Sequence, residues 1–111
     1  MTTLPTWGGR SKFRYEGSVE NGTTIVYGKG RDGKGYKVRV EARQYAELRR
    51  HFRNRGNVRV GTSRTDPPPG SIGAWLMANV TRTAIASYVA PILIHEGYAE
   101  KADRKDIRVT R

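Results

Sequence analysis

An arginine-rich stretch near the middle of the chain is the strongest chemical feature of this sequence. Five arginines fall within thirteen positions, and Glu47 is the single acid among them: Arg43, Arg49, Arg50, Arg53 and Arg55. A guanidinium group keeps its charge and forks onto phosphate oxygens, so this composition indicates phosphate contact. The alternative is a solvated helix face on which Glu47 pairs locally, although such a face usually mixes both signs of charge.

A second basic segment is rich in glycine. Residues 28–35 read Gly-Lys-Gly-Arg-Asp-Gly-Lys-Gly, and residues 28–33 fit the spacing of a dinucleotide-binding fingerprint. That motif needs a helix N-terminus after the glycines to hold the phosphate, whereas residues 36–40 have a strand pattern. The sequence therefore favours a hairpin tip over a nucleotide site. Lys29, Arg31 and Lys34 would be the charges of a basic finger that lies on the DNA backbone or in the minor groove, unless the hairpin tip is mobile and makes no contact.

Catalysis and metal binding find little support in the remaining side chains. Neither His51 nor His95 has an acid at motif spacing, and the acids form no ligand cluster. A nuclease site would have to use Asp32, Glu41 and Arg43, but an arginine does not release its proton as the usual lysine does. We therefore expect a protein that is not an enzyme and that uses no cofactor and no metal.

The charge of the chain is large and unevenly distributed. The 111 residues carry 21 Lys and Arg against 10 Asp and Glu, a formal charge of +11 that attracts polyanions. Residues 1–65 hold fifteen basic and five acidic side chains, whereas residues 66–111 hold six and five. The longest apolar run, residues 84–94, is too short to span a bilayer, and cysteine is absent. These features predict a soluble cytoplasmic protein, nucleoid-associated in a bacterium, with no membrane partner.

The N-terminal third has the pattern of a β-meander. We expect residues 1–11 to form a flexible arm, whose Trp7 could dock it or stack on a base. Residues 12–40 read as three antiparallel strands, with Asn21-Gly22 favouring a tight hairpin between the first two. In the third strand, alternation predicts that Tyr36, Val38 and Val40 face inward. Residues 41–55 then show helical periodicity, with Tyr45, Leu48 and Phe52 as the apolar stripe.

The C-terminal half reads as a short strand, two helices and a hairpin. Residues 58–60 form the strand, and a proline-rich connector leads to a helix over residues 71–80. A second helix, capped by Thr81 or Thr83, follows and stops at Gly97. Pro91 lies inside it, so we expect either a kink at residues 87–88, which we favour, or two short helices meeting near residue 90. Residues 98–101 and 107–111 can pair as strands.

From residue 41 onward, this order of helix, strand, helix, helix, strand and strand resembles the winged helix-turn-helix family of DNA-binding proteins. The resemblance covers residues 41–111 and rests on element order and spacing. It implies that the third helix enters the major groove, with its start at Arg82 and with Thr83 and Ser87 facing the bases. It also implies that the wing tip, Arg104 and Lys105, touches phosphates or the minor groove. The fold class expected is α+β, with an N-terminal antiparallel β-meander packed on a winged helix-turn-helix in a single domain, residues 1–111.

Three functions follow from these expectations. The first is a sequence-reading DNA-binding protein, such as a transcriptional regulator. The second is a nonspecific architectural DNA- or RNA-binding protein, in which the meander and the arginine helix bind the backbone. The third is a protein-interaction module of winged-helix shape. We expect nucleic acid as the partner, DNA rather than RNA, and a homodimer is compatible with the sequence.

Overall fold

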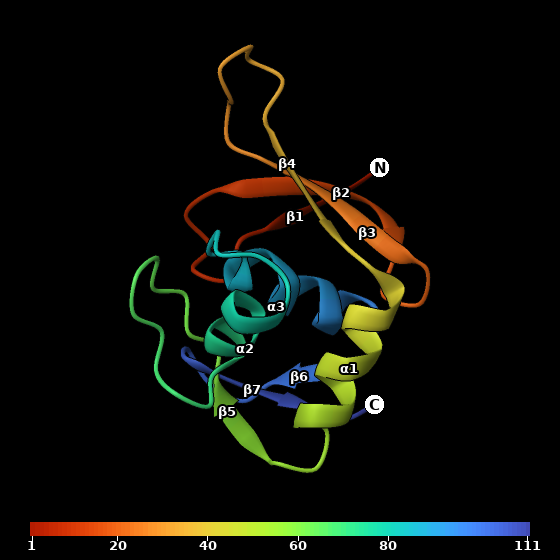
Figure 1. The fold of residues 1–111 in the computed structure, drawn as a ribbon, viewed down its shortest axis with the longest axis vertical. Coiled ribbons are helices and arrows are strands. Elements are labelled where there is room, and N and C mark those ends of the chain that lie inside the picture. The colour runs from red at the N-terminus through yellow and green to blue at the C-terminus, as the bar shows by residue number, and fades with distance from the viewer.

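The computed structural model describes all residues, 1–111, and is a mixed α+β fold of two antiparallel sheets and three helices (Figure 1). The first sheet has the strand order β1-β2-β3-β4 and the second has the order β5-β7-β6. One cluster of 20 buried apolar residues includes members from both sheets and all three helices. None of the helices combines the length and the apolar composition that crossing a bilayer requires.

The first sheet contains the predicted meander and one further strand. Its strands are β1 (Thr2–Pro5), β2 (Lys12–Ser18), β3 (Gly22–Tyr27) and β4 (Tyr36–Val40). The expectation of a flexible arm is wrong for residues 2–5, because β1 pairs antiparallel with β2 from Thr2↔Tyr15 to Pro5↔Lys12. The predicted hairpin is present, but its turn is residues 19–21, and Gly22 begins β3 with a φ of +92°, a conformation that glycine adopts without steric cost.

The inner face of this sheet packs on the helices. Phe13, Tyr15 and Ile25 are buried on this face, as period-two alternation requires. The register places Tyr36 on the predicted inner face, opposite Tyr27 on β3, but this side chain is 52% exposed rather than buried. The sheet therefore extends beyond the core at its β3–β4 end, where the connecting hairpin projects from the body of the protein (Figure 1).

The first helix, α1 (Ala42–Phe52), begins with a capping box. The Glu41 side chain accepts from the backbone of Gln44, whose side chain accepts from the Glu41 amide at 2.8 Å. The predicted apolar stripe of Tyr45, Leu48 and Phe52 is buried. The Tyr45 hydroxyl makes a buried 2.7 Å hydrogen bond with Thr23 Oγ1, which ties α1 to β3.

The second sheet and the C-terminal helices follow the predicted order. The strand β5 (Asn57–Arg59) is followed by α2 (Ile72–Asn79), α3 (Ala86–His95), β6 (Ala99–Lys101) and β7 (Asp106–Val109). Ser71 caps α2 by accepting a 3.1 Å hydrogen bond from the Ala74 amide. Gly97 ends the α3 segment with a φ of +85°, as predicted.

The third helix differs from the prediction at its start. Neither Thr81 nor Thr83 caps it, and the N-cap residue is Ile85, which makes no side-chain cap. A single helix runs through Pro91, so the alternative of two short helices is wrong. Proline has no amide to donate to the carbonyl of Ser87, four residues earlier. That carbonyl accepts a 2.9 Å hydrogen bond from the backbone amide of Trp7 instead.

Candidate nucleic-acid interface

Few of the basic side chains are neutralised within the protein. The ion pairs are Arg39 with Glu41 at 3.5 Å, Arg59 with Asp106 at 3.3 Å, and Arg108 with Glu100. They engage three of the 21 Lys and Arg side chains. Most of the positive charge is therefore available to an external anion.

The arginine helix divides into free and engaged side chains. Arg43, Arg50 and Arg53 lie on the exposed face of α1, and Glu47 makes no ion pair with them. Arg49 is half-buried: its guanidinium carbon lies 4.3 Å from the centre of the Tyr98 ring, and its Nε donates to the carbonyl of Arg111.

Arg55, the last arginine of the cluster, bonds to a backbone carbonyl in the last turn of α1. Arg55 Nε donates to the His51 carbonyl at 2.7 Å. Desolvation, together with the nearby Arg55, lowers the pKa of His51, so this histidine adds no charge to the cluster at neutral pH. Arg55 is exposed and makes no ion pair, so the cluster predicted from sequence provides four exposed guanidinium groups, with Arg49 half-buried.

The basic hairpin between β3 and β4 exposes its three cations. Lys29, Arg31 and Lys34 are exposed at the projecting tip, which β4 follows rather than a helix (Figure 1). The Asp32 carboxylate accepts a 2.9 Å hydrogen bond from the Lys34 amide, which shapes the turn. Asp32 also lies at the far end of β4 from Glu41, so the acids of the nuclease alternative are separated by a strand.

The outer face of the first sheet is a basic surface that the sequence-based site prediction does not include. Arg14, Val26 and Lys37 occupy one cross-strand row, and Lys12 lies further along β2. These three cationic side chains are exposed and make no ion pair, whereas Arg39 pairs with Glu41. Alternation of cationic and apolar residues in β2 and β4 is the sequence signal that could have identified this surface.

The third helix does not present the face that the resemblance implies. Arg82 and Thr83 are exposed but lie in the loop before α3, and Ser87 is half-buried in its first turn. The N-terminal sheet covers the helix at the next residue, because the Tyr88 ring stacks on Tyr27 at 4.8 Å and lies 5.1 Å from Phe13. Tyr88 is thus part of the junction between α3 and the sheet. The predicted groove-reading start at Arg82 is therefore corrected to a loop followed by a covered helix.

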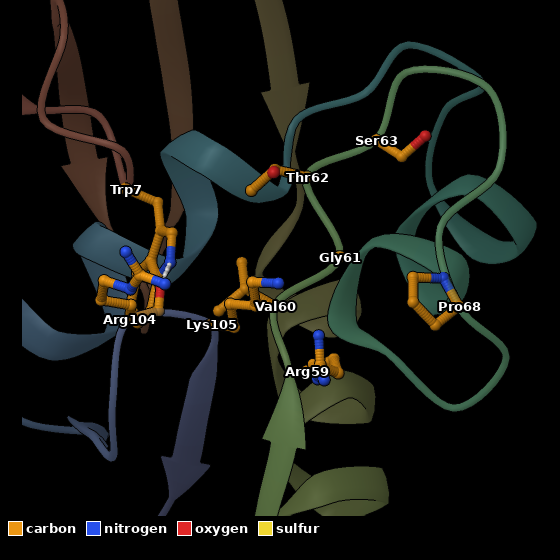
Figure 2. A pocket seen from close by; sticks show the side chains of 9 residues that line it. All are labelled: Trp7, Arg59, Val60, Gly61, Thr62, Ser63, Pro68, Arg104 and Lys105. Atoms are coloured by element: carbon orange, nitrogen blue, oxygen red, sulfur yellow. Dashed lines mark hydrogen bonds between the residues drawn. The ribbon is translucent and has the colours of Figure 1, made fainter.

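The wing tip borders a cavity of about 220 Å³ (Figure 2). Nine residues line it: Trp7, Arg59, Val60, Gly61, Thr62, Ser63, Pro68, Arg104 and Lys105. The Trp7 indole nitrogen donates a 2.7 Å hydrogen bond to the Arg104 carbonyl, which fixes the tip while its cationic side chains remain exposed (Figure 2). Arg59 and the hydroxyl residues of this cavity were not identified from the sequence, because Arg59 comes from β5 and the hydroxyl residues from the loop that follows it.

The turn at the wing tip is held by one carboxylate. Asp103 accepts hydrogen bonds from the amides of Lys105 at 2.8 Å and Asp106 at 2.9 Å. These two bonds hold the pKa of Asp103 below its ordinary value. The tip is therefore a defined turn that presents Arg104 and Lys105.

The predicted site residues do not converge on one site. The basic hairpin projects at one end of the longest axis, α1 lies along one side, and the second sheet lies towards the other end (Figure 1). No three His, Asp or Glu side chains come close enough together to hold a metal ion. The arrangement can bind an extended polyanion at several separate patches. Comparison of this chain with family models, curated proteins and solved structures found no match.

Proposed function

We propose that this protein binds nucleic acid through the phosphate backbone, as a nonspecific DNA- or RNA-binding protein. The observation that carries the proposal is the excess of unpaired cations: ion pairs engage only three of the 21 Lys and Arg side chains. A polyanion that neutralises such charges releases its counterions, which is the main driving force of nonspecific binding.

The cover over α3 favours backbone binding over sequence reading. Bases are read by side chains that reach into a groove, whereas phosphate contacts carry no sequence information. Here Tyr88 is packed under the N-terminal sheet, and the Ser87 carbonyl is bonded to Trp7. The exposed cations lie instead on the hairpin, the outer sheet face, α1 and the wing tip.

The winged-helix likeness supports a phosphate-contacting role for the wing. The order α1-β5-α2-α3-β6-β7 follows the family pattern, and β5 and β6 both pair with β7. In this proposal the Arg104 and Lys105 side chains touch phosphates, as the wing of the family does. The helix that the family inserts into DNA serves here as a packing element for the N-terminal sheet.

The test is a comparison of two sets of alanine variants on random-sequence duplex DNA and RNA, read by fluorescence anisotropy. Replacing the exposed Arg43, Arg50 and Arg53 by Ala should weaken binding to all sequences by similar factors. The control, Arg108→Ala, removes a cation that Glu100 already neutralises, and should weaken binding much less per charge removed. Absence of binding by the unmodified protein at low salt would overturn the proposal. An Arg108→Ala effect on the dissociation constant as large, per charge removed, as that of the triple variant would overturn it as well.

A further inference from the structure

A row of tyrosines runs from the core to the surface at the β3–β4 end of the first sheet. The Tyr88 ring stacks on Tyr27 with centroids 4.8 Å apart and planes inclined by 24°. Tyr27 in turn lies 5.6 Å from Tyr36, its cross-strand partner. The row ends at Tyr36, which is 52% exposed, so its ring is available to a further flat group.

A cavity of about 400 Å³ lies beside this row. Its lining comes from five separate segments of the chain: Ser11, Lys12, Tyr27, Gly28, Tyr36, Arg64 and Tyr88. Lys12 and Arg64 are exposed and form no ion pair, and no acidic residue lines the cavity. The cavity therefore combines aromatic rings with uncompensated positive charge.

We propose that this cavity binds one unpaired nucleotide of a single-stranded nucleic acid, with the base stacked on Tyr36 and the phosphate held by Lys12 and Arg64. The inference rests on the proposed function, nucleic-acid binding, and specifies that this cavity takes a single strand rather than a duplex. Aromatic rings stack on any base, and basic side chains beside them track the sugar–phosphate backbone.

The neighbouring hairpin gives the strand a path away from the cavity. Gly28 and Tyr36 line the cavity and also bound the connection that carries Lys29, Arg31 and Lys34. A strand that leaves its base on Tyr36 can continue along these cations. A duplex cannot use the site in this way, because its bases are paired and stacked on one another.

The experiment compares a short single-stranded oligonucleotide with a duplex of the same sequence, using the full-length protein. A fluorescent purine analogue in the strand reports stacking by quenching, and anisotropy gives the dissociation constants. Tyr36→Ala should weaken single-strand binding about tenfold, abolish the quenching and leave duplex binding unchanged. Tyr36→Phe keeps the ring and should retain both affinity and quenching. A circular-dichroism melt of each variant checks the fold, which an exposed side chain influences little.

The outcomes separate this inference from the proposed function. Equal weakening on single strand and duplex, or unchanged binding with Tyr36→Ala, would overturn the stacking site while leaving backbone binding in place. Absence of binding to either form by the unmodified protein would overturn both. An RNA strand of the same sequence is the second arm, and Tyr36-dependent quenching with either sugar supports the site.

Discussion

The backbone amide of Trp7 donates a 2.9 Å hydrogen bond to the carbonyl of Ser87, the acceptor that Pro91 leaves without its helical partner. The indole of the same tryptophan donates to the Arg104 carbonyl at 2.7 Å, and Lys101 Nζ lies 4.8 Å from the centre of its ring. The N-terminal segment thus supplies the hydrogen bond that α3 lacks at Pro91 and is joined to the turn between β6 and β7 at Arg104.

Trp7→Ala should lower the free energy of unfolding by roughly 1–2.5 kcal/mol, because the indole hydrogen bond and the cation–π interaction with Lys101 are both removed. Trp7→Phe keeps a ring but not the indole N–H, so it should lower the free energy of unfolding by about 1 kcal/mol. Chemical denaturation of both variants measures the difference. Equal stability of Trp7→Ala and the unmodified protein would contradict the anchoring role.

Gly73 should not tolerate a side chain, because a Cβ there would lie 1.9 Å from the Gly61 carbonyl oxygen. We expect Gly73→Ala to cost about 3 kcal/mol, the upper end of overpacking effects. The matched control is Gly33→Ala in the basic hairpin, where φ is +76° but no atom lies within 4 Å. This change should cost about 1 kcal/mol, from backbone conformation alone. Thermal melts measure the difference. A lower melting temperature for Gly33→Ala than for Gly73→Ala would contradict the packing of α2 against residue 61.

The wing-tip turn should loosen in acid. The folded-state pKa of Asp103 is depressed below about 3.8, so the turn is stabilised above that pH and loses this stabilisation as pH falls through the folded pKa. The amide resonances of Lys105 and Asp106 should therefore titrate together with that of Asp103 at a pH below 3.8. In Asp103→Ala this titration should vanish. Amide shifts that stay constant across the range would contradict the assignment.

Arg82→Ala should change affinity for all sequences by the same factor, because Arg82 lies in a loop before a covered helix. Competition between random-sequence DNA and a sequence selected from that pool, measured for the unmodified protein and for Arg82→Ala, gives the ratio of the two affinities in each protein. Weakening confined to the selected sequence would restore Arg82 as a base-reading residue and contradict the account of α3.

Replacing Lys29, Arg31 and Lys34 with Ser should leave the melting temperature unchanged, since all three are exposed at a projecting tip. The same variant should reduce the salt dependence of binding to duplex DNA, by roughly 0.9 in log–log slope for each phosphate that the hairpin no longer neutralises. An unchanged slope of the salt dependence would show that the hairpin does not contact the phosphates.

Local patterns predicted most of the elements, because their signals lie within a few residues. The apolar stripe of α1, the helix predicted over residues 71–80 and the stop at Gly97 are examples, and all are present in the structure. The start of α3 differs from the prediction because Thr81 and Thr83 resemble caps, although tertiary packing of Ile85 and Ala86 sets the boundary.

Long-range contacts could not be predicted from the sequence in the same way. The strand β1 is short and is defined by its partner β2, and the bond from Trp7 to Ser87 joins residues far apart in the chain. The tyrosine cavity draws its lining from five segments, none of which has a local signature. The cationic composition indicates a polyanionic partner, which stays a prediction, and only the structure separates exposed arginines from engaged ones such as Arg49.

The most direct test of the central claim is the affinity of the unmodified protein for random-sequence DNA, measured across a series of salt concentrations. If unpaired cations bind the backbone, the logarithm of the association constant should fall linearly with the logarithm of the salt concentration, with a slope of roughly −0.9 per neutralised phosphate on duplex DNA. A slope equivalent to several neutralised phosphates supports the account. Affinity that does not change with salt, or no binding to DNA or RNA even at low salt, would contradict it.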